Sequence, residues 1–204
     1  SGIEDRATVI RGRCLPYGDG ITFWPIVGVL RDAAGIHQFD SPPDARAKIS
    51  ALLPQDGDDA ALVGEHLAGL LGLGTAAPGI QETFWAVRRL FEELATSRPL
   101  VVIFDDIHWG EATFLDLVEY LGALIRRAPV FIVCITRPEI QETRPGWASG
   151  TSTGTLMVLE PLTETEIDGL IANLLGGDEL DPSARMRIGM VAEGNPLFLE
   201  QTVR

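Results

Sequence analysis

Residues 101 to 109 read VVIFDDIHW, an apolar run that leads directly into two adjacent carboxylates, Asp105 and Asp106. β-Branched and aromatic residues in a short run predict a buried strand. In open α/β folds the ligand site lies at the carboxyl ends of the strands. The stretch therefore predicts a strand that delivers two acids to such an edge.

Three further segments predict strands: residues 7 to 14 (ATVIRGRC), 129 to 137 (PVFIVCITR) and 156 to 162 (LMVLEPL). Their near-continuous apolar character is typical of parallel strands buried on both faces, so we expect an α/β fold with a parallel sheet covered by helices.

Helices are predicted between these strands. One begins near Trp24 and Pro25, because proline is tolerated in a first helical turn. Others cover residues 44 to 53, 58 to 73, 80 to 97 and 111 to 127. After Pro161 the pattern is helical only, and Thr163 with Glu166 forms a predicted capping box. We therefore expect an α/β body over residues 1 to 160 and a small, truncated helical lid over residues 161 to 204.

Composition excludes several classes of protein. The chain has 204 residues, 46% of them hydrophobic, and a net charge of -13, which disfavours direct binding to nucleic acid or an anionic membrane. No apolar run approaches the roughly 18 residues that a spanning helix needs. Cys14 and Cys134 have no CxxC spacing and are expected to be reduced thiols. We expect a cytoplasmic protein.

The two aspartates have two interpretations. In phosphate-handling sites an acid at a strand end holds Mg²⁺, and a second acid beside it orients or deprotonates the attacking water. On this reading the stretch is a Walker B motif, with Asp105 on the metal and Asp106 as the base. Alternatively, the aspartates only cap the next helix. Arg137, after the next strand, is expected at the same edge, where it can contact a γ-phosphate; structurally it can equally be an exposed residue before a proline turn.

The stretch EGNPLFLEQ, residues 193 to 201, places a Gly-Asn-Pro turn between two apolar helices. By itself this is a common helix–helix turn. The three histidines, His37, His66 and His108, lie in separate segments without HxH or HExxH spacing, which disfavours a metal hydrolase.

Together, GRCLPYGDGITFWPIVGVLRDAAG, VVIFDDIHW, CITRPE and GNPLFLEQ resemble the P-loop ATPase module of the STAND class. Within that class the chain is most similar to the AAA-like ATPases joined to bacterial adenylate/guanylate cyclase domains or to LuxR-type and SARP-type transcription regulators. The resemblance covers nearly the whole chain.

The resemblance implies ATP and Mg²⁺ as cofactors. It assigns the metal to Asp105, water activation to Asp106, γ-phosphate sensing to Arg137, and contact with the nucleotide base to the turn of Gly194, Asn195 and Pro196. It also implies that ATP binding and hydrolysis switch an attached effector domain. His108 and Trp109 match the family pattern, and we assign them to packing and orientation and not to chemistry.

The chain departs from the family in one respect. The phosphate loop, GxxxxGK followed by Ser or Thr, should precede residues 7 to 14, but Lys48 is the one lysine of the sequence and no glycines precede it in its segment. We therefore expect the phosphate cradle, and with it the central first strand of the sheet, to lie in an N-terminal segment outside these residues. Otherwise the sheet has closed up or borrowed a strand from a second chain, which predicts a homo-oligomer.

Two functions remain open on the sequence. One is part of an ATP-dependent regulatory switch that is hydrolysis-incompetent as this chain alone. The other is a non-enzymatic interaction or scaffold module derived from an ATPase, which the missing lysine favours.

Overall fold

The computed structural model describes residues 2, 5–16, 22–54, 59–74, 79–147, 154–176 and 181–203. The chain divides into two compact units, residues 1–155 and residues 156–204. Each unit has a hydrophobic core of its own. No helix in the described ranges has both the length and the apolar character that crossing a bilayer requires.

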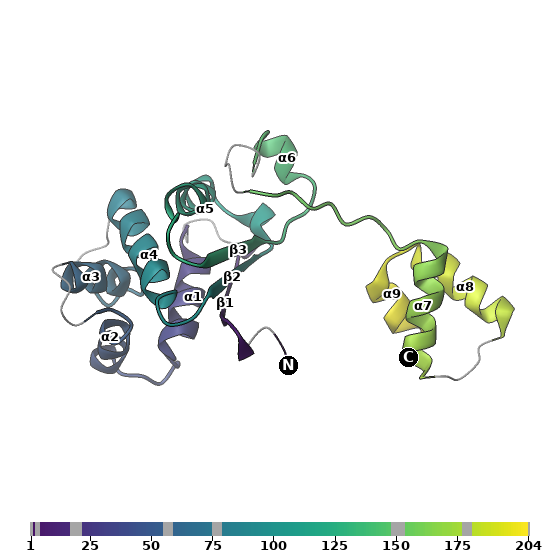
Figure 1. Ribbon diagram of the computed structural model, residues 1–204, viewed down its shortest axis with the longest axis horizontal. Coiled ribbons are helices and arrows are strands. Elements are labelled where there is room, and N and C mark those ends of the chain that lie inside the picture. The colour runs from purple at the N-terminus through teal and green to yellow at the C-terminus, as the bar shows by residue number, and fades with distance from the viewer. Residues whose placement is uncertain are drawn as a thin grey trace. The chain divides into compact units, whose positions relative to one another are not determined.

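The first unit is built on three parallel strands in the order β1-β2-β3 (Figure 1). They are β1 (Thr8–Arg13), β2 (Leu100–Asp105) and β3 (Val130–Cys134). The register places Gly12 opposite Phe104, and Phe104 opposite Cys134. A parallel sheet flanked by helices confirms the predicted α/β class, and its three strands are consistent with an incomplete P-loop ATPase core.

The helices of this unit lie between and after the strands. They are α1 (Trp24–Ala34), α2 (Pro42–Ser50), α3 (Ala60–Leu70), α4 (Ile80–Leu94), η2 (Ile107–Trp109, a 3-10 turn), α5 (Ala112–Leu124) and α6 (Ile140–Thr143). The predicted start of α1 is confirmed, because Pro25 lies in its first turn and Gly35 ends it in a left-handed conformation.

The main core lies on one face of the sheet. Ile10, Val102 and Phe104 point into it and are almost completely buried. The Phe104 ring meets Phe114 of α5 edge to face, with 5.1 Å between ring centroids. Figure 1 shows α1 and α4 on the same side of the sheet. This core anchors β2, and therefore fixes where its carboxyl end lies.

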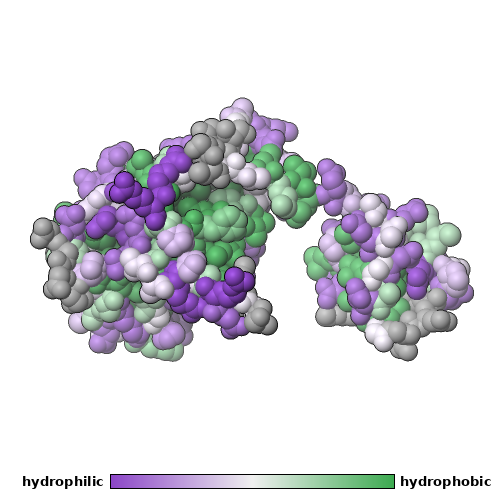
Figure 2. All heavy atoms as spheres, viewed as in Figure 1, coloured by the Kyte–Doolittle hydropathy of each residue, from purple (hydrophilic) through white to green (hydrophobic). Residues whose placement is uncertain are grey.

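The expectation of burial on both faces is wrong for β3. Phe131 is 66% exposed and Ile135, just after the strand, is 49% exposed. Figure 2 shows apolar surface where Figure 1 draws β3. β3 is the last strand of the sheet, and no described strand pairs with its outer edge. The apolar pattern was a correct sign of a strand, but the neighbours that would cover it are not among the described residues.

The prediction of a fourth strand over residues 156 to 162 is also wrong. These residues are not assigned to a strand, and Met157 and Leu159 are 78% and 86% exposed. A strand needs a neighbour for its backbone hydrogen bonds, which an apolar sequence alone does not supply.

The second unit contains α7 (Glu164–Leu175), α8 (Pro182–Ala192) and α9 (Pro196–Val203). The capping box is confirmed: the Thr163 hydroxyl accepts from the Glu166 amide, and the Glu166 carboxylate accepts from the Thr163 amide at 2.8 Å. Ile171, Ala192 and Leu199 form the buried centre of this unit.

Candidate functional site

Asp105 ends β2 and lies opposite Arg13, the last residue of β1. Its backbone carbonyl accepts a hydrogen bond from the Cys14 amide at 3.0 Å, so the chain after β1 continues to pair with β2. Its carboxylate oxygen Oδ1 accepts from the Asp106 amide at 2.9 Å, and the side chain is half-buried. The strand end thus holds the Asp105 carboxylate in place at the edge of the sheet.

Asp106 leaves the strand direction. Its backbone has φ 55° and ψ 37°, the left-handed region, which aspartate tolerates better than most residues. Its carboxylate oxygen Oδ2 accepts from Arg13 Nε at 2.9 Å and from Arg13 Nη2 at 2.7 Å. The predicted base is therefore held in an ion pair with the neighbouring strand.

Arg13 is a residue of this site that the sequence reasoning missed. Its hydrogen bond to Asp106, together with the charges of Asp106 and Asp105, raises the pKa of the guanidinium above its ordinary value. The available signal was its position: Arg13 is the last residue but one of the strand predicted over residues 7 to 14, and the ends of parallel strands meet at one edge.

The capping interpretation of the two aspartates finds no support in the described residues. Helix α5 begins after Glu111, which occupies its N-cap position, and η2 separates the aspartates from it. Glu111 accepts a hydrogen bond from the Thr22 hydroxyl. Instead, the Asp105 carboxylate accepts from the Asp106 amide, and the Asp106 carboxylate accepts from Arg13 of β1.

Arg137 lies three residues beyond the end of β3, which is shorter than predicted. It is exposed, and its backbone carbonyl accepts from the Thr136 hydroxyl at 3.1 Å. The segment before it stays beside β2, since the Ile135 amide donates to the Phe104 carbonyl at 2.8 Å and the Ile135 carbonyl accepts from the Ile107 amide at 3.1 Å. Arg137 therefore lies just beyond the same edge of the sheet as the acids. Among the described residues, its side chain makes no hydrogen bond or ion pair with either aspartate.

The turn of Gly194, Asn195 and Pro196 lies in the second unit and joins α8 to α9. Gly194 has φ 76°, and its carbonyl accepts from the Leu162 amide at 2.8 Å. The Asn195 side chain accepts from the Leu197 amide at 2.9 Å and so caps α9. These contacts explain the turn as a structural element; Asn195 and Pro196 are exposed.

His108 and Trp109 follow the acids on η2, with their ring centroids 5.1 Å apart. Both imidazole nitrogens of His108 are shielded from solvent without a hydrogen-bond partner among the described residues. Trp109 is 47% exposed, so the expectation that it packs holds only for part of its ring.

The donor set at the strand end suits Mg²⁺ chemically. Mg²⁺ prefers carboxylate oxygens and is usually held by one or two of them, together with water and substrate phosphates. Asp105 and Asp106 provide such oxygens at adjacent positions. Within the described ranges no cluster of three or more His, Cys, Asp or Glu side chains forms a complete protein cage. The acid pair therefore fits a metal shared with phosphates better than a metal held by protein alone.

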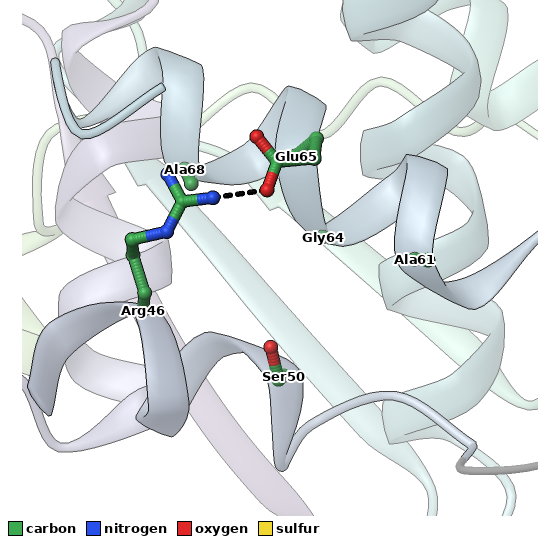
Figure 3. A pocket seen from close by; sticks show the side chains of 6 residues that line it. All are labelled: Arg46, Ser50, Ala61, Gly64, Glu65 and Ala68. Carbon is green, nitrogen blue, oxygen red and sulfur yellow. Dashed lines mark hydrogen bonds and ion pairs between the residues drawn. The ribbon is translucent and has the colours of Figure 1, made fainter. Parts of the chain in front are cut away.

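A pocket of about 200 Å³ lies elsewhere, between α2 and α3 (Figure 3). It is lined by Arg46, Ser50, Ala61, Gly64, Glu65 and Ala68. Arg46 is paired with Glu65 across it and also donates to the Leu73 carbonyl. The lining is otherwise made of small side chains, and none of the residues of the acid site contributes to it.

Comparison with known proteins agrees with this geometry. The family model described as an AAA ATPase domain matches residues 2–133. An uncharacterized protein of Rhizobium meliloti (strain 1021) is 27% identical over 211 residues, a match that covers 96% of this chain and 20% of that protein. The chain therefore spans about a fifth of the length of this relative. No solved structure matches the chain. Because the family model covers well over half of the sequence, and the acid-bearing strand lies within the matched region, this protein belongs to the AAA ATPase domain family.

Proposed function

We propose that this chain is part of a STAND-type regulatory switch that binds and hydrolyses ATP and controls an attached effector, either a transcription regulator or a nucleotide cyclase domain. The observation that carries the proposal is the acid pair at the carboxyl end of β2, in a family whose members are ATPases. The much greater length of the relative supports a setting in a larger protein.

The roles of the residues follow from their positions. Asp105 would hold Mg²⁺, which, when bound, neutralises the phosphate charge. Asp106 would take the proton of the water that attacks the γ-phosphorus, as the bond to the leaving ADP oxygen breaks. Its Oδ2 is bonded to Arg13, so this role requires that the ion pair opens. Arg137 would contact the γ-phosphate, and Gly194, Asn195 and Pro196 the nucleotide base.

The phosphate cradle would come from an N-terminal segment outside the 204 residues. A lysine and a loop of backbone amides supply most phosphate binding in P-loop proteins, and Lys48 does not serve. Lys48 lies on α2, and its ammonium group donates to Asp40 at 2.6 Å and to the Gly35 carbonyl at 2.8 Å. The open edge of β3 supports the proposal that a further strand belongs there.

A scaffold function is the second candidate. The absence of a phosphate-loop lysine from these residues favours it for the chain taken alone, because phosphoryl transfer depends on positioning and on charge neutralisation. On this proposal the α/β body and the helical segment would bind partner proteins without nucleotide.

Calorimetric titration with Mg-ATP tests the first proposal. It should be made on the 204-residue chain and on a longer product of the same gene that includes the preceding segment, each with and without Asp105→Asn. Asp116→Asn is the matched control, because Asp116 is an exposed acid of α5, paired at the surface with Arg144.

We expect the longer product, and not the 204-residue chain, to bind Mg-ATP saturably. Hydrolysis by that product should fall about 100-fold or more in Asp105→Asn, since the metal-side charge is lost, and remain unchanged in Asp116→Asn. A longer product that binds no nucleotide would favour the scaffold function. Binding by the 204-residue chain that Asp105→Asn abolishes would show a phosphate site without a P-loop lysine.

A further inference from the structure

The ion pair between Arg13 and Asp106 places a positive charge where a metal-binding acid pair would attract one. Arg13 directs two nitrogens, Nε and Nη2, at the single oxygen Asp106 Oδ2, at 2.9 Å and 2.7 Å. Asp105 also contributes to the raised pKa of the guanidinium, so the charge of Arg13 acts on both acids. One arginine from the neighbouring strand therefore partly neutralises the whole pair.

The ion pair between Arg13 and Asp106 is exposed to solvent and can open readily. The Arg13 side chain is 68% exposed and the Asp106 side chain 30% exposed. Exposed ion pairs contribute little to stability, because water and salt screen them and the side chains lose freedom. A buried pair would hold the carboxylate firmly; this one can open without disturbing the core.

A divalent cation at Asp105 and the guanidinium on Asp106 Oδ2 compete for the negative charge of one acid pair. Mg²⁺ and Mn²⁺ bind carboxylate oxygens at close range, and a fixed positive charge next to those oxygens repels an incoming dication. The backbone helps to set up this competition, because the left-handed conformation of Asp106 turns the chain out of β2 at the residue that meets Arg13.

We propose that Arg13 is a tethered counter-cation of the Asp105–Asp106 pair, whose charge opposes the divalent metal at Asp105 and must move away from Asp106 before the metal binds. The inference rests on the proposed function and adds its regulation: any event that draws Arg13 away from the strand end prepares the site, and its return closes the site to metal. Arg13 acts through Asp106, so it is a positioning residue and not a catalytic one.

The test measures metal binding without nucleotide or turnover. Mn²⁺ is titrated into the isotope-labelled 204-residue chain at low ionic strength, and the paramagnetic broadening of the backbone amide signals of Asp106, Ile107 and His108 gives the affinity at this site. The variants are Arg13→Gln, Arg11→Gln and Asp106→Asn, together with the double variant of Arg13 and Asp106.

Arg11→Gln is the matched control. Arg11 is exposed on the same strand and, two residues before Arg13, on the same face of the sheet. The substitution Arg11→Gln removes the same charge and leaves the Arg13–Asp106 ion pair in place. Because Arg13 is exposed, Arg13→Gln should fold normally, and the unchanged amide spectrum away from β1 and η2 verifies this.

We expect Arg13→Gln to bind Mn²⁺ about three- to tenfold more tightly than the natural chain, and Arg11→Gln to differ by less than about twofold. The gain should disappear when Asp106→Asn is also present, because Asp106 is the group that holds the charge of Arg13 beside Asp105. Equal affinity in Arg13→Gln and the natural chain, or an equal gain in Arg11→Gln, would overturn the proposal, as would no binding at all in Arg13→Gln. Failure of the ATPase proposal would instead appear as a longer product that does not bind Mg-ATP, whatever the Mn²⁺ result.

Discussion

At the scale of single residues, two adjacent aspartates have different environments. Asp105 continues β2 and accepts from the next backbone amide, whereas Asp106 is left-handed and ion-paired with Arg13. The difference arises because the chain leaves the strand between them. This difference supports the proposed division of roles, in which Asp105 holds the metal and Asp106 accepts the proton.

Cys14 and Cys134 provide a prediction about pH. Burial raises the pKa of both thiols to about 12, aided at Cys14 by Asp106 and Asp105, and at Cys134 by Cys14. In the unfolded chain the thiols lose these protons near the ordinary cysteine pKa of 9.0. The folded state holds its protons more tightly, so this contribution to stability is complete below pH 9 and is lost as the pH rises from about 9 to 12.

Urea denaturation at pH 8 and pH 10 measures the effect. Each thiol should lower the free energy of unfolding by about 1.3 kcal/mol between the two pH values. In Cys14→Ala the decrease in the free energy of unfolding between pH 8 and pH 10 should be smaller by the contribution of one thiol, whatever the effect of the substitution on stability at pH 8. If the variant and the natural chain show the same pH dependence, the Cys14 thiol has an ordinary pKa in the folded protein.

At the scale of elements, the two edges of the sheet differ. Arg11 and Arg13 are exposed on β1, and charges of this kind discourage pairing with another chain. β3 carries no charged residue over Val130–Cys134 and exposes Phe131. One edge is thus protected and the other is suited to receive a strand, which agrees with the proposed position of the phosphate-loop strand.

The close approach between β1 and α1 at Pro25 depends on Gly12. A Cβ atom there would lie 2.4 Å from the Pro25 carbonyl oxygen and 3.2 Å from Phe104 Cδ1. Gly12→Ala must therefore push α1 from the sheet, and we expect it to lower the free energy of unfolding by about 1–3 kcal/mol in urea denaturation.

Gly28→Ala is the comparison on the helix side. Its Cβ would lie 3.7 Å from the nearest atom, the Arg11 carbonyl oxygen, which is ordinary contact. Alanine is the better residue in a helix interior, so this variant should be more stable by about 0.5–1 kcal/mol. An equal decrease in the free energy of unfolding in both variants would mean that the packing of α1, and not the close approach at Gly12, determines their stability.

At the scale of the whole molecule, the chain consists of two units that meet in sequence at residues 155 and 156. The segment that follows this boundary is apolar yet open to solvent: Leu156, Met157, Val158 and Leu159 are 47%, 78%, 62% and 86% exposed. Exposed backbone without regular hydrogen bonding is where proteases cut first.

Brief digestion with chymotrypsin should therefore cut within residues 156 to 159 and separate the two units, as mass spectrometry of the fragments would show. Phe39 is the internal comparison: it is 89% exposed, but its turn is held by the His37 amide, which donates to Asp40 at 2.8 Å, and by Lys48 on Asp40. Cleavage at Phe39 before the 156 to 159 segment would contradict this account of the boundary.

Much of the architecture was predictable from local patterns. The strands β1 and β2, the start of α1 at Trp24, and the capping box at Thr163 were all predicted correctly, because propensity, proline placement and capping act over a few residues. The predictions that failed were those that required a neighbour. Burial of β3 on both faces needs elements packed against its open face, and pairing of residues 156 to 162 needs a neighbouring strand; the described residues supply neither.

The sequence by itself determined the α/β class and brought two acids to the end of a buried strand, since both follow from an apolar run that ends in Asp105 and Asp106. Only the tertiary structure decided what faces those acids. Arg13 is 93 residues from Asp106 in the chain, and the parallel register of β1 and β2 brings them into contact. Such a pairing depends on how strands are ordered in the sheet, and no pattern within either strand specifies it.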